Sequence, residues 1–301
     1  MLVDPGLDIA KPGYVPVTWA TRASFCHPLS ADRWVKSLED ASSAESDLAV
    51  LRMYESIIAG VDTKIGVYLS LGAGDGLVDT VLLPYLSRGA LTYVSVDLSQ
   101  DMCRLAVDRM KLFSATSLGV VTDFERESDF LRDILHGLEG HAKFINGTSI
   151  LGNLDLAEVN FFENLHAVMK RGDWMLLSVG TGSFGQPIDR SMLDARLDWK
   201  NLRGMLSCGI CMHTGEDVQS VEHDLENRLN VRKGRSDVPD TESVELWDIR
   251  SGAALMHFRR YSVDALVQWV ERLFKFEVVA SAQLPFSDAG LGVAGILLRV
   301  C

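Results

Sequence analysis

The chain has 301 residues, of which 47% are hydrophobic and 23% charged, so it is a globular protein of one large domain or two modest ones. Its formal net charge of −12 excludes a general attraction for the phosphate backbone of nucleic acid. The sequence begins without the basic start and apolar run of a secretory signal, and no apolar stretch is long enough to span a bilayer. We therefore expect a cytoplasmic protein that binds neither nucleic acid nor membrane.

The five cysteines do not predict a disulfide framework, because their number is odd and their spacing is irregular. Cys208 and Cys211 form a C-x-x-C pair, and His213 follows. A zinc site would need a second pair of ligands, and none stands out in the sequence. We expect free thiols and no metal.

Apolar strands alternate with amphipathic helices from Lys64 onward. The sequence predicts strands over 65–71, 91–96, 118–122, 143–145 and 174–179, with helices over 78–86, 100–113, 130–138 and 156–170. This alternation predicts an α/β fold, a Rossmann-like parallel sheet with helices on both faces. Ligands bind such a sheet beyond the carboxyl ends of its strands, so the residues that follow the strands are the candidate site.

The alternation stops after Thr181. The more polar stretch that follows is predicted to form two helices and a hairpin, after which the core pattern resumes with a helix over 263–274 and strands over 276–282 and 292–300. We therefore expect a core domain over residues 61–181 and 262–301. Residues 182–261 would be a small inserted substrate or lid domain, to which the N-terminal segment 1–60 contributes.

The first predicted strand ends in the glycine-rich turn Gly72-Ala73-Gly74-Asp75-Gly76. Three glycines at alternate positions let the backbone approach a ligand and open a helix N-terminus toward it. The dinucleotide fingerprint G-x-G-x-x-G needs one more glycine, and Leu77 stands in its place. The turn alone is therefore an ambiguous signal for a nucleotide or a related cofactor.

Acidic residues follow the next two strands. Asp97, with Leu98 beside it, is placed to accept hydrogen bonds from ribose hydroxyls. Its alternative role, the N-cap of the next helix, can be filled by Ser99. Asp123 and Phe124 are placed to bind the amino group and the ring of an adenine, although Asp123 taken alone is equally well explained as a helix cap.

The fourth strand ends in residues 146–154, NGTSILGNL, which bring polar groups and flexible backbone to the centre of the sheet edge. We expect Asn146 and Gly147 to bind the cofactor there. Gly147, Thr148 and Asn153 are the residues expected to orient the substrate.

Five segments of the chain, taken in this order, carry a resemblance to a known family: LGAGDG (71–76), YVSVDLS (93–99), VVTDFER (120–126), FINGTSILGNLD (144–155) and MKRGDWMLLSVGT (169–181). In these segments the chain resembles the histidine-specific N-methyltransferase family of ergothioneine biosynthesis, whose relatives include fungal N-methyltransferases of ergot-alkaloid pathways. The tail over 276–300 resembles the last two strands of that family.

The resemblance implies a class I methyltransferase that uses S-adenosyl-L-methionine (SAM) and releases S-adenosyl-L-homocysteine (SAH). It implies that the turn 72–76 holds the methionine part, Asp97 the ribose and Asp123-Phe124 the adenine. It further implies that Gly147 and Asn153 lie at the α-amino group of the acceptor.

The chain departs from the family at several positions. Ser70 stands where the strand before the turn usually carries an acid. In the family, a Glu and a Ser of one region bind the imidazole of the substrate. The corresponding region here is 255–261, where the side chains of Met256 and Phe258 cannot accept a hydrogen bond from an imidazole N–H. We therefore do not expect histidine itself to be the acceptor. The candidate acceptor contacts are Tyr14, Tyr54, His257, Arg259 and Tyr261.

The sequence thus predicts N-methylation of a small amino-acid-like metabolite by in-line transfer, without a dedicated nucleophile. Two alternatives stay open. An NAD-dependent oxidoreductase would also use a glycine turn and Asp97, although the last glycine of its fingerprint is missing. A catalytically degenerate binding protein is compatible with Ser70 and with the missing tyrosines: the tyrosine-rich N-terminal region of the family has no clear counterpart in residues 1–60, and the predicted helix around 191–201 lacks a tyrosine.

Overall fold

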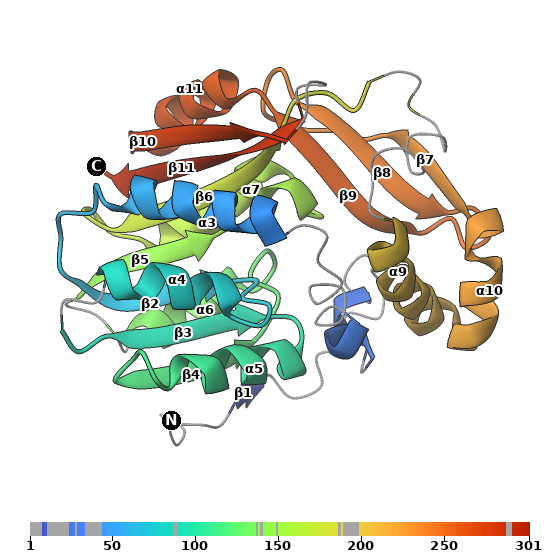
Figure 1. Cartoon of the computed structure of the whole chain (residues 1–301), viewed down its shortest axis with the longest axis horizontal. Helices are drawn as coiled ribbons and strands as arrows, with labels where there is room; N and C mark the ends of the chain where they lie inside the picture. Colours follow the sequence, from blue (N-terminus) through green and yellow to red (C-terminus); the bar gives the residue numbers. More distant parts are fainter. Residues whose placement is uncertain are drawn as a thin grey trace.

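The computed structural model describes residues 8–10, 24–27, 29–33, 44–86, 89–136, 138, 141–148, 150–185, 188, 199–286 and 291–301. An 11-stranded sheet runs through the molecule, with helices on both of its faces (Figure 1). Its core strands are β1 (Asp8–Ala10), β2 (Ile65–Leu71), β3 (Thr92–Asp97), β4 (Thr116–Val121), β5 (Ala142–Gly147), β6 (Trp174–Thr181), β10 (Phe276–Pro285) and β11 (Gly292–Val300). The helices around them are α3 (Ala44–Ile58), α4 (Leu77–Leu86), α5 (Gln100–Met110), α6 (Ser128–His136), the 3-10 turn η1 (Leu151–Asn153), α7 (Glu158–Val168) and α11 (Val263–Phe274).

The core strands lie in the order β1-β4-β3-β2-β5-β6-β11-β10. The pairs from β1 to β6 are parallel, whereas β11 runs antiparallel to both of its neighbours. Chain order reverses between β2 and β5, and crevices for ligands form at the carboxyl ends of strands at such a reversal. The Rossmann-like α/β sheet expected from the sequence is therefore confirmed.

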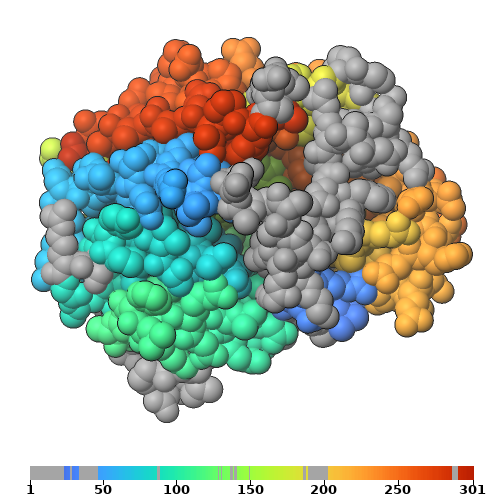
Figure 2. Space-filling model, in the orientation of Figure 1, coloured from blue at the N-terminus to red at the C-terminus, as the bar shows by residue number. Residues whose placement is uncertain are grey.

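Burial explains why these segments form these strands. The central strand β2, IGVYLSL, is buried at every residue but Gly66, as expected for a parallel strand that is covered on both faces. The edge strand β10 instead alternates between less and more accessible residues. Helices α3, α4 and α5 cover one face of the sheet and lie side by side (Figure 2), whereas α6, α7 and α11 cover the other.

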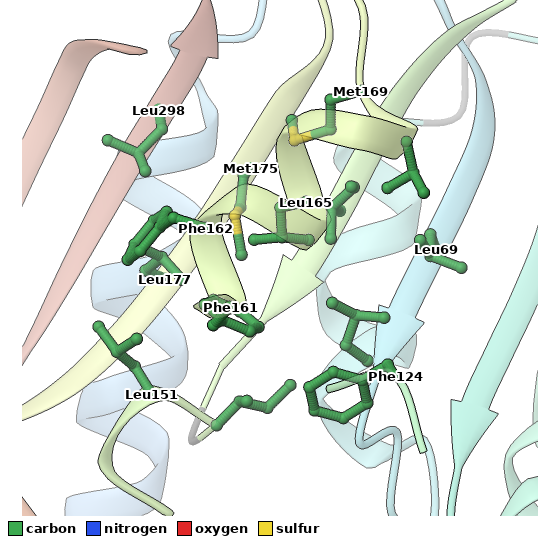
Figure 3. Packing of buried hydrophobic residues seen from close by; sticks show 14 of the residues in the cluster. Leu69, Phe124, Leu151, Phe161, Phe162, Leu165, Met169, Met175, Leu177 and Leu298 are labelled. Carbon is green, nitrogen blue, oxygen red and sulfur yellow. The ribbon is translucent and has the colours of Figure 1, made fainter. Parts of the chain in front are cut away.

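The hydrophobic core on the α6, α7 and α11 side extends to the carboxyl edge of the sheet (Figure 3). There the ring of Phe124 packs edge-to-face on Phe161, with 6.1 Å between the ring centroids. Leu151 of η1 belongs to the same cluster and is fully buried. The loops after β4 and β5 are therefore anchored in the core by packed side chains, which fixes the positions of the polar groups in these loops.

The segment after β6 forms α9 (Trp199–Thr214), α10 (Val218–Arg228), β7 (Leu229–Lys233), β8 (Glu242–Asp248) and β9 (Ala254–Tyr261). The three strands form an antiparallel meander, which joins the main sheet where β9 pairs with the last two residues of β6. The segment has a hydrophobic cluster of its own, between its two helices and its strands. The two helices and the β8–β9 hairpin were expected from the sequence; β7 and α3 were not.

No helix in the described part of the chain combines the length and the apolarity needed to cross a membrane.

Candidate functional site

The glycine turn lies at the reversal point of the sheet and has a backbone that only glycine adopts easily. Gly72, Gly74 and Gly76 have φ of 56°, 53° and 75°. A side chain is strained in this left-handed region. A Cβ on Gly76 would also lie 3.0 Å from Cα of Ala106 in α5. The amide of Gly72 donates to the carbonyl oxygen of Val96 (2.7 Å), which ties the turn to the end of β3.

Asp97 ends β3 beside this turn, and its carboxylate is almost completely buried. Its two oxygens accept hydrogen bonds from the backbone N–H of Gly74 (3.1 Å) and of Ser99 (2.9 Å). Burial raises the pKa of Asp97 to about 6, although the backbone donors partly oppose the shift. The N-cap of α5 is Ser99, whose Oγ accepts from the amide of Met102. The helix therefore does not need Asp97 as its cap.

A cavity of about 180 Å³ opens between the carboxyl ends of β2, β3 and β4 and the loop after β5. One side is lined by the glycine turn, the end of β3 and the first turn of α5, through Gly72, Gly74, Asp97, Leu98, Ser99 and Met102. The facing side comes from the loops after β4 and β5, through Phe124, Glu125, Thr148, Ile150, Asn153 and Leu154. Phe25, Ser30 and Ala31 near the N-terminus and Met205 of α9 complete the wall.

Seven of the residues expected at the site from the sequence line this cavity: Gly72, Gly74, Asp97, Leu98, Phe124, Thr148 and Asn153. Ala73, Asp75, Gly76, Asp123, Asn146 and Gly147 do not line it. Asp75 lies at the start of α4, where it accepts from the amide of Leu77 (3.1 Å) and pairs with Arg109 (3.0 Å). Its contacts therefore fix the shape of the turn.

The Asp123 carboxylate is fully buried and has donors from its own turn. It accepts from Arg126 (2.8 Å) and from the amide of Glu125 (3.0 Å). Phe124 is the member of this pair that lines the cavity. Gly147 packs against β6, where a Cβ would lie 2.7 Å from Cε of Met175.

Asn146 belongs to a buried polar cluster under the turn. Its amide nitrogen donates to Asp79 of α4 (2.7 Å), and its amide oxygen accepts from the backbone of Thr148 (3.2 Å). The Asp79 carboxylate is nearly inaccessible and also accepts from the hydroxyls of Tyr68 (2.7 Å), Ser70 (3.0 Å) and Tyr93 (2.7 Å). The carboxylate of Asp79 on the helix therefore faces the hydroxyl of Ser70 on the strand.

The four candidate acceptor contacts that the structure describes lie apart from the cavity lining. Tyr54 of α3 is buried against the sheet, where its hydroxyl donates to Ser178 (2.6 Å) and burial raises its pKa to about 12. His257 lies between Asp155 (3.6 Å) and Glu245 (3.8 Å). Arg259 and Tyr261 of β9 are buried behind η1. Tyr14 is outside the described residues.

Sequence reasoning missed several residues of the cavity wall, among them Phe25, Met102, Ile150 and Met205. Phe25 and Met205 come from segments far from the core motifs, and only the fold brings them to the sheet edge. Glu125 was also missed; its carboxylate accepts from the backbone amides of Asp155 (3.4 Å) and Leu156 (2.8 Å) and so shapes the loop after η1.

Comparison with known proteins shows which family the sequence around the cavity matches. Residues 42–191 match the model of a family described as histidine-specific, SAM-dependent methyltransferases. This part of the chain belongs to that family. The match includes the glycine turn, Asp97 and the whole loop after β5, so the family's segment holds most of the cavity lining. No curated protein matches the sequence.

Several solved structures are similar to this chain at low sequence identity. The 1,6-didemethyltoxoflavin-N1-methyltransferase of Burkholderia thailandensis, solved with 1,6-didemethyltoxoflavin and SAH, is 14% identical, with a TM-score of 0.51 over 97% of this chain and 93% of that one. A SAM-dependent methyltransferase of Leishmania major is 11% identical, with a TM-score of 0.48 over 93% and 83%. The N-methyltransferase NodS of Bradyrhizobium japonicum, solved with SAH, is 10% identical, with a TM-score of 0.42 over 83% and 85%.

Family and fold together identify a methyltransferase that uses SAM. The alternatives of an NAD-dependent oxidoreductase and of a degenerate binding protein are not favoured by either comparison.

Proposed function

We propose that the protein transfers the methyl group of SAM to a nitrogen atom of a small amino-acid-like metabolite. One observation carries the proposal. A single cavity has the carboxylate of Asp97 and the glycine turn on one side, and the amide side chain of Asn153 on the other. A methyl donor held at the first side would present its methyl group toward the second.

The first side of the cavity fits SAM by the chemistry of its groups. The Asp97 carboxylate suits the ribose hydroxyls, because charge-assisted hydrogen bonds are the strong ones. Leu98 and Met102 on this side, with Phe124 on the facing side, offer an apolar slot for the adenine ring. Gly72 and Gly74 leave their backbone open to the methionine part, because neither has a side chain that would fill the space.

The second side fits an acceptor amine. Thr148 and Asn153 supply hydrogen-bonding groups, and Ile150, Leu154 and Met205 supply an apolar wall. A low-dielectric wall lowers the pKa of an amine, which keeps its nitrogen lone pair free without a strong base. Support for a nitrogen acceptor also comes from the family description and from the N1-methyltransferase that shares the fold over 97% of this chain.

SAM supplies a methyl group on a positively charged sulfur. The amine nitrogen forms the new N–C bond as the S–C bond breaks, the electron pair goes to sulfur, and the amine then loses a proton to solvent. The contribution of the chain is alignment and exclusion of water. We propose that residues 182–261 and the N-terminal segment 1–60 close the acceptor side, because Met205 and Phe25 already reach the cavity from them.

The affinity for SAH should depend on pH through Asp97. Its pKa of about 6 lies above the ordinary value of 3.8. Between pH 3.8 and about pH 6, Asp97 is therefore protonated in the native protein and ionised in the unfolded protein. Asp97 therefore contributes less to the free energy of unfolding as pH rises through this window. Ribose hydroxyls favour the ionised form, so we expect SAH affinity to fall about tenfold per pH unit below about 6. Calorimetric titration across this range checks this, and a flat profile would contradict it.

The acceptor is tested by a screen of amino acids and related amines, with SAH release as the readout. We expect at least one amine to accelerate release. Asn153→Ala should lower kcat/KM for that amine about tenfold, because the free energy of one lost hydrogen bond to the orienting amide corresponds to about that change in rate. The variant should leave the SAH affinity unchanged. The matched control is Asn160→Ala, at an exposed position of α7. Activity confined to alcohols, thiols or carboxylic acids would contradict the proposal.

A further inference from the structure

Two side chains of β9 contact the η1 turn, which comprises η1 itself and its C-cap, Leu154. The hydroxyl of Tyr261 donates to the carbonyl oxygen of Leu151 (3.0 Å). The guanidinium of Arg259 donates to the carbonyl oxygen of Leu154 (2.8 Å). These two hydrogen bonds bracket Gly152 and Asn153. A Cβ on Gly152 would lie 3.4 Å from the carbonyl oxygen of Arg259, so the turn packs directly on the backbone of β9.

Both side chains are fixed in turn by Glu158, which is fully buried at the start of α7. Its carboxylate lies 3.3 Å from Nε of Arg259 and 3.0 Å from the hydroxyl of Tyr261, which shares its single hydrogen between this carboxylate and the carbonyl oxygen of Leu151. The same Nε donates to the carbonyl oxygen of Arg235 (3.2 Å). Burial and the nearby carboxylate raise the pKa of Tyr261, so its hydroxyl stays protonated and able to donate.

At the N-terminal side of the turn, Ile150 and Leu151 pack in the hydrophobic core. At its C-terminal side, Asn153 and Leu154 line the cavity. Leu151 and Leu154 are therefore the two points at which the backbone on either side of Asn153 is held. Both anchors come from β9, a strand of the segment that follows the family-matched part of the chain.

We propose that Arg259 and Tyr261 are positioning residues that hold the η1 turn so that Asn153 presents its amide to the acceptor. This inference rests on the proposed function, because that function assigns the acceptor to Asn153. The sequence made both residues candidates for direct contact with the acceptor; the role proposed here acts through the turn. Small displacements of an orienting group are costly in transfer reactions, because the reacting atoms must be aligned.

The test compares Arg259→Lys and Tyr261→Phe with Arg228→Lys. Arg228 is also a buried arginine of the same segment, but it pairs with Asp248 (2.8 Å), and the two residues lie at the ends of α10 and β8. A lysine cannot reproduce the two-point contacts of either arginine. Backbone hydrogen exchange is measured in the complex with SAH, and kcat/KM is measured per SAH-binding site with the amine that is methylated fastest in the screen above.

We expect the amides over 151–156 to exchange at least about tenfold faster in the two β9 variants, with kcat/KM about tenfold lower and the SAH affinity within about twofold of wild type. Arg228→Lys should change neither exchange in the turn nor kcat/KM. Unchanged exchange in the turn would overturn the proposal, and so would faster exchange with unchanged kcat/KM. If SAH binds but no amine is methylated, the proposed function fails, and exchange alone decides whether β9 holds the turn.

Discussion

Asp97→Ala is expected to weaken SAH binding by about a hundredfold or more. The variant removes the one carboxylate in the described lining whose position at the end of β3 suits ribose hydroxyls, and hydrogen bonds to a charged group contribute about 1.5–3 kcal/mol each. It also removes the acceptor for the amide of Gly74, so the glycine turn loses a contact that holds its shape. Isothermal titration calorimetry of the purified variant measures the change directly.

Asp108→Ala is the matched control, because Asp108 is exposed on α5 and pairs with Lys111 at the surface. Its SAH affinity should equal that of wild type. Since burial of Asp97 costs free energy, the variant should remain folded, and its unfolding midpoint verifies this. SAH affinity within about threefold of wild type in folded Asp97→Ala would refute the assignment of Asp97 to the ribose.

Asp79→Ala is expected to destabilise the protein by about 4 kcal/mol or more. The buried carboxylate accepts hydrogen bonds from Tyr68, Ser70, Tyr93 and Asn146. Truncation leaves these donors without their acceptor inside the core, and each unsatisfied buried donor costs about 1–3 kcal/mol. Urea unfolding, monitored by circular dichroism, measures the loss.

Asp79→Asn keeps one acceptor oxygen and the shape of the side chain, so its loss should be smaller than that of Asp79→Ala. Asp108→Ala should change the free energy of unfolding by less than about 0.5 kcal/mol. A loss of less than about 1 kcal/mol in Asp79→Ala would show that water or neighbouring groups satisfy these donors, and the cluster would then not be a structural anchor of the turn.

The sequence predicted the core sheet and the first side of the cavity well, because both rest on local patterns. Continuous apolar runs predict buried parallel strands, and the residues after a strand lie at its carboxyl end wherever the sheet is parallel. Gly72, Gly74, Asp97 and Phe124 were found in this way, and all four line the cavity.

The rest of the cavity wall and the contacts of β9 could not be predicted in the same way, because they depend on contacts between distant segments. Arg259 and Tyr261 are polar residues after a long polar stretch, and from sequence they resemble ligand contacts. Their actual partners, Glu158 and the η1 carbonyl groups, are about a hundred residues away in the chain, and only the fold brings them together. Phe25 and Met205 reach the cavity for the same reason.

The crystal structure of the complex with SAH tests the central proposal most directly. We predict that the ribose hydroxyls lie within hydrogen-bonding distance of the Asp97 carboxylate, and that the adenine lies beside Leu98, Met102 and Phe124. The sulfur atom should face Asn153 across the cavity. A ribose bound away from Asp97, or a sulfur atom that faces away from Asn153, would contradict the account.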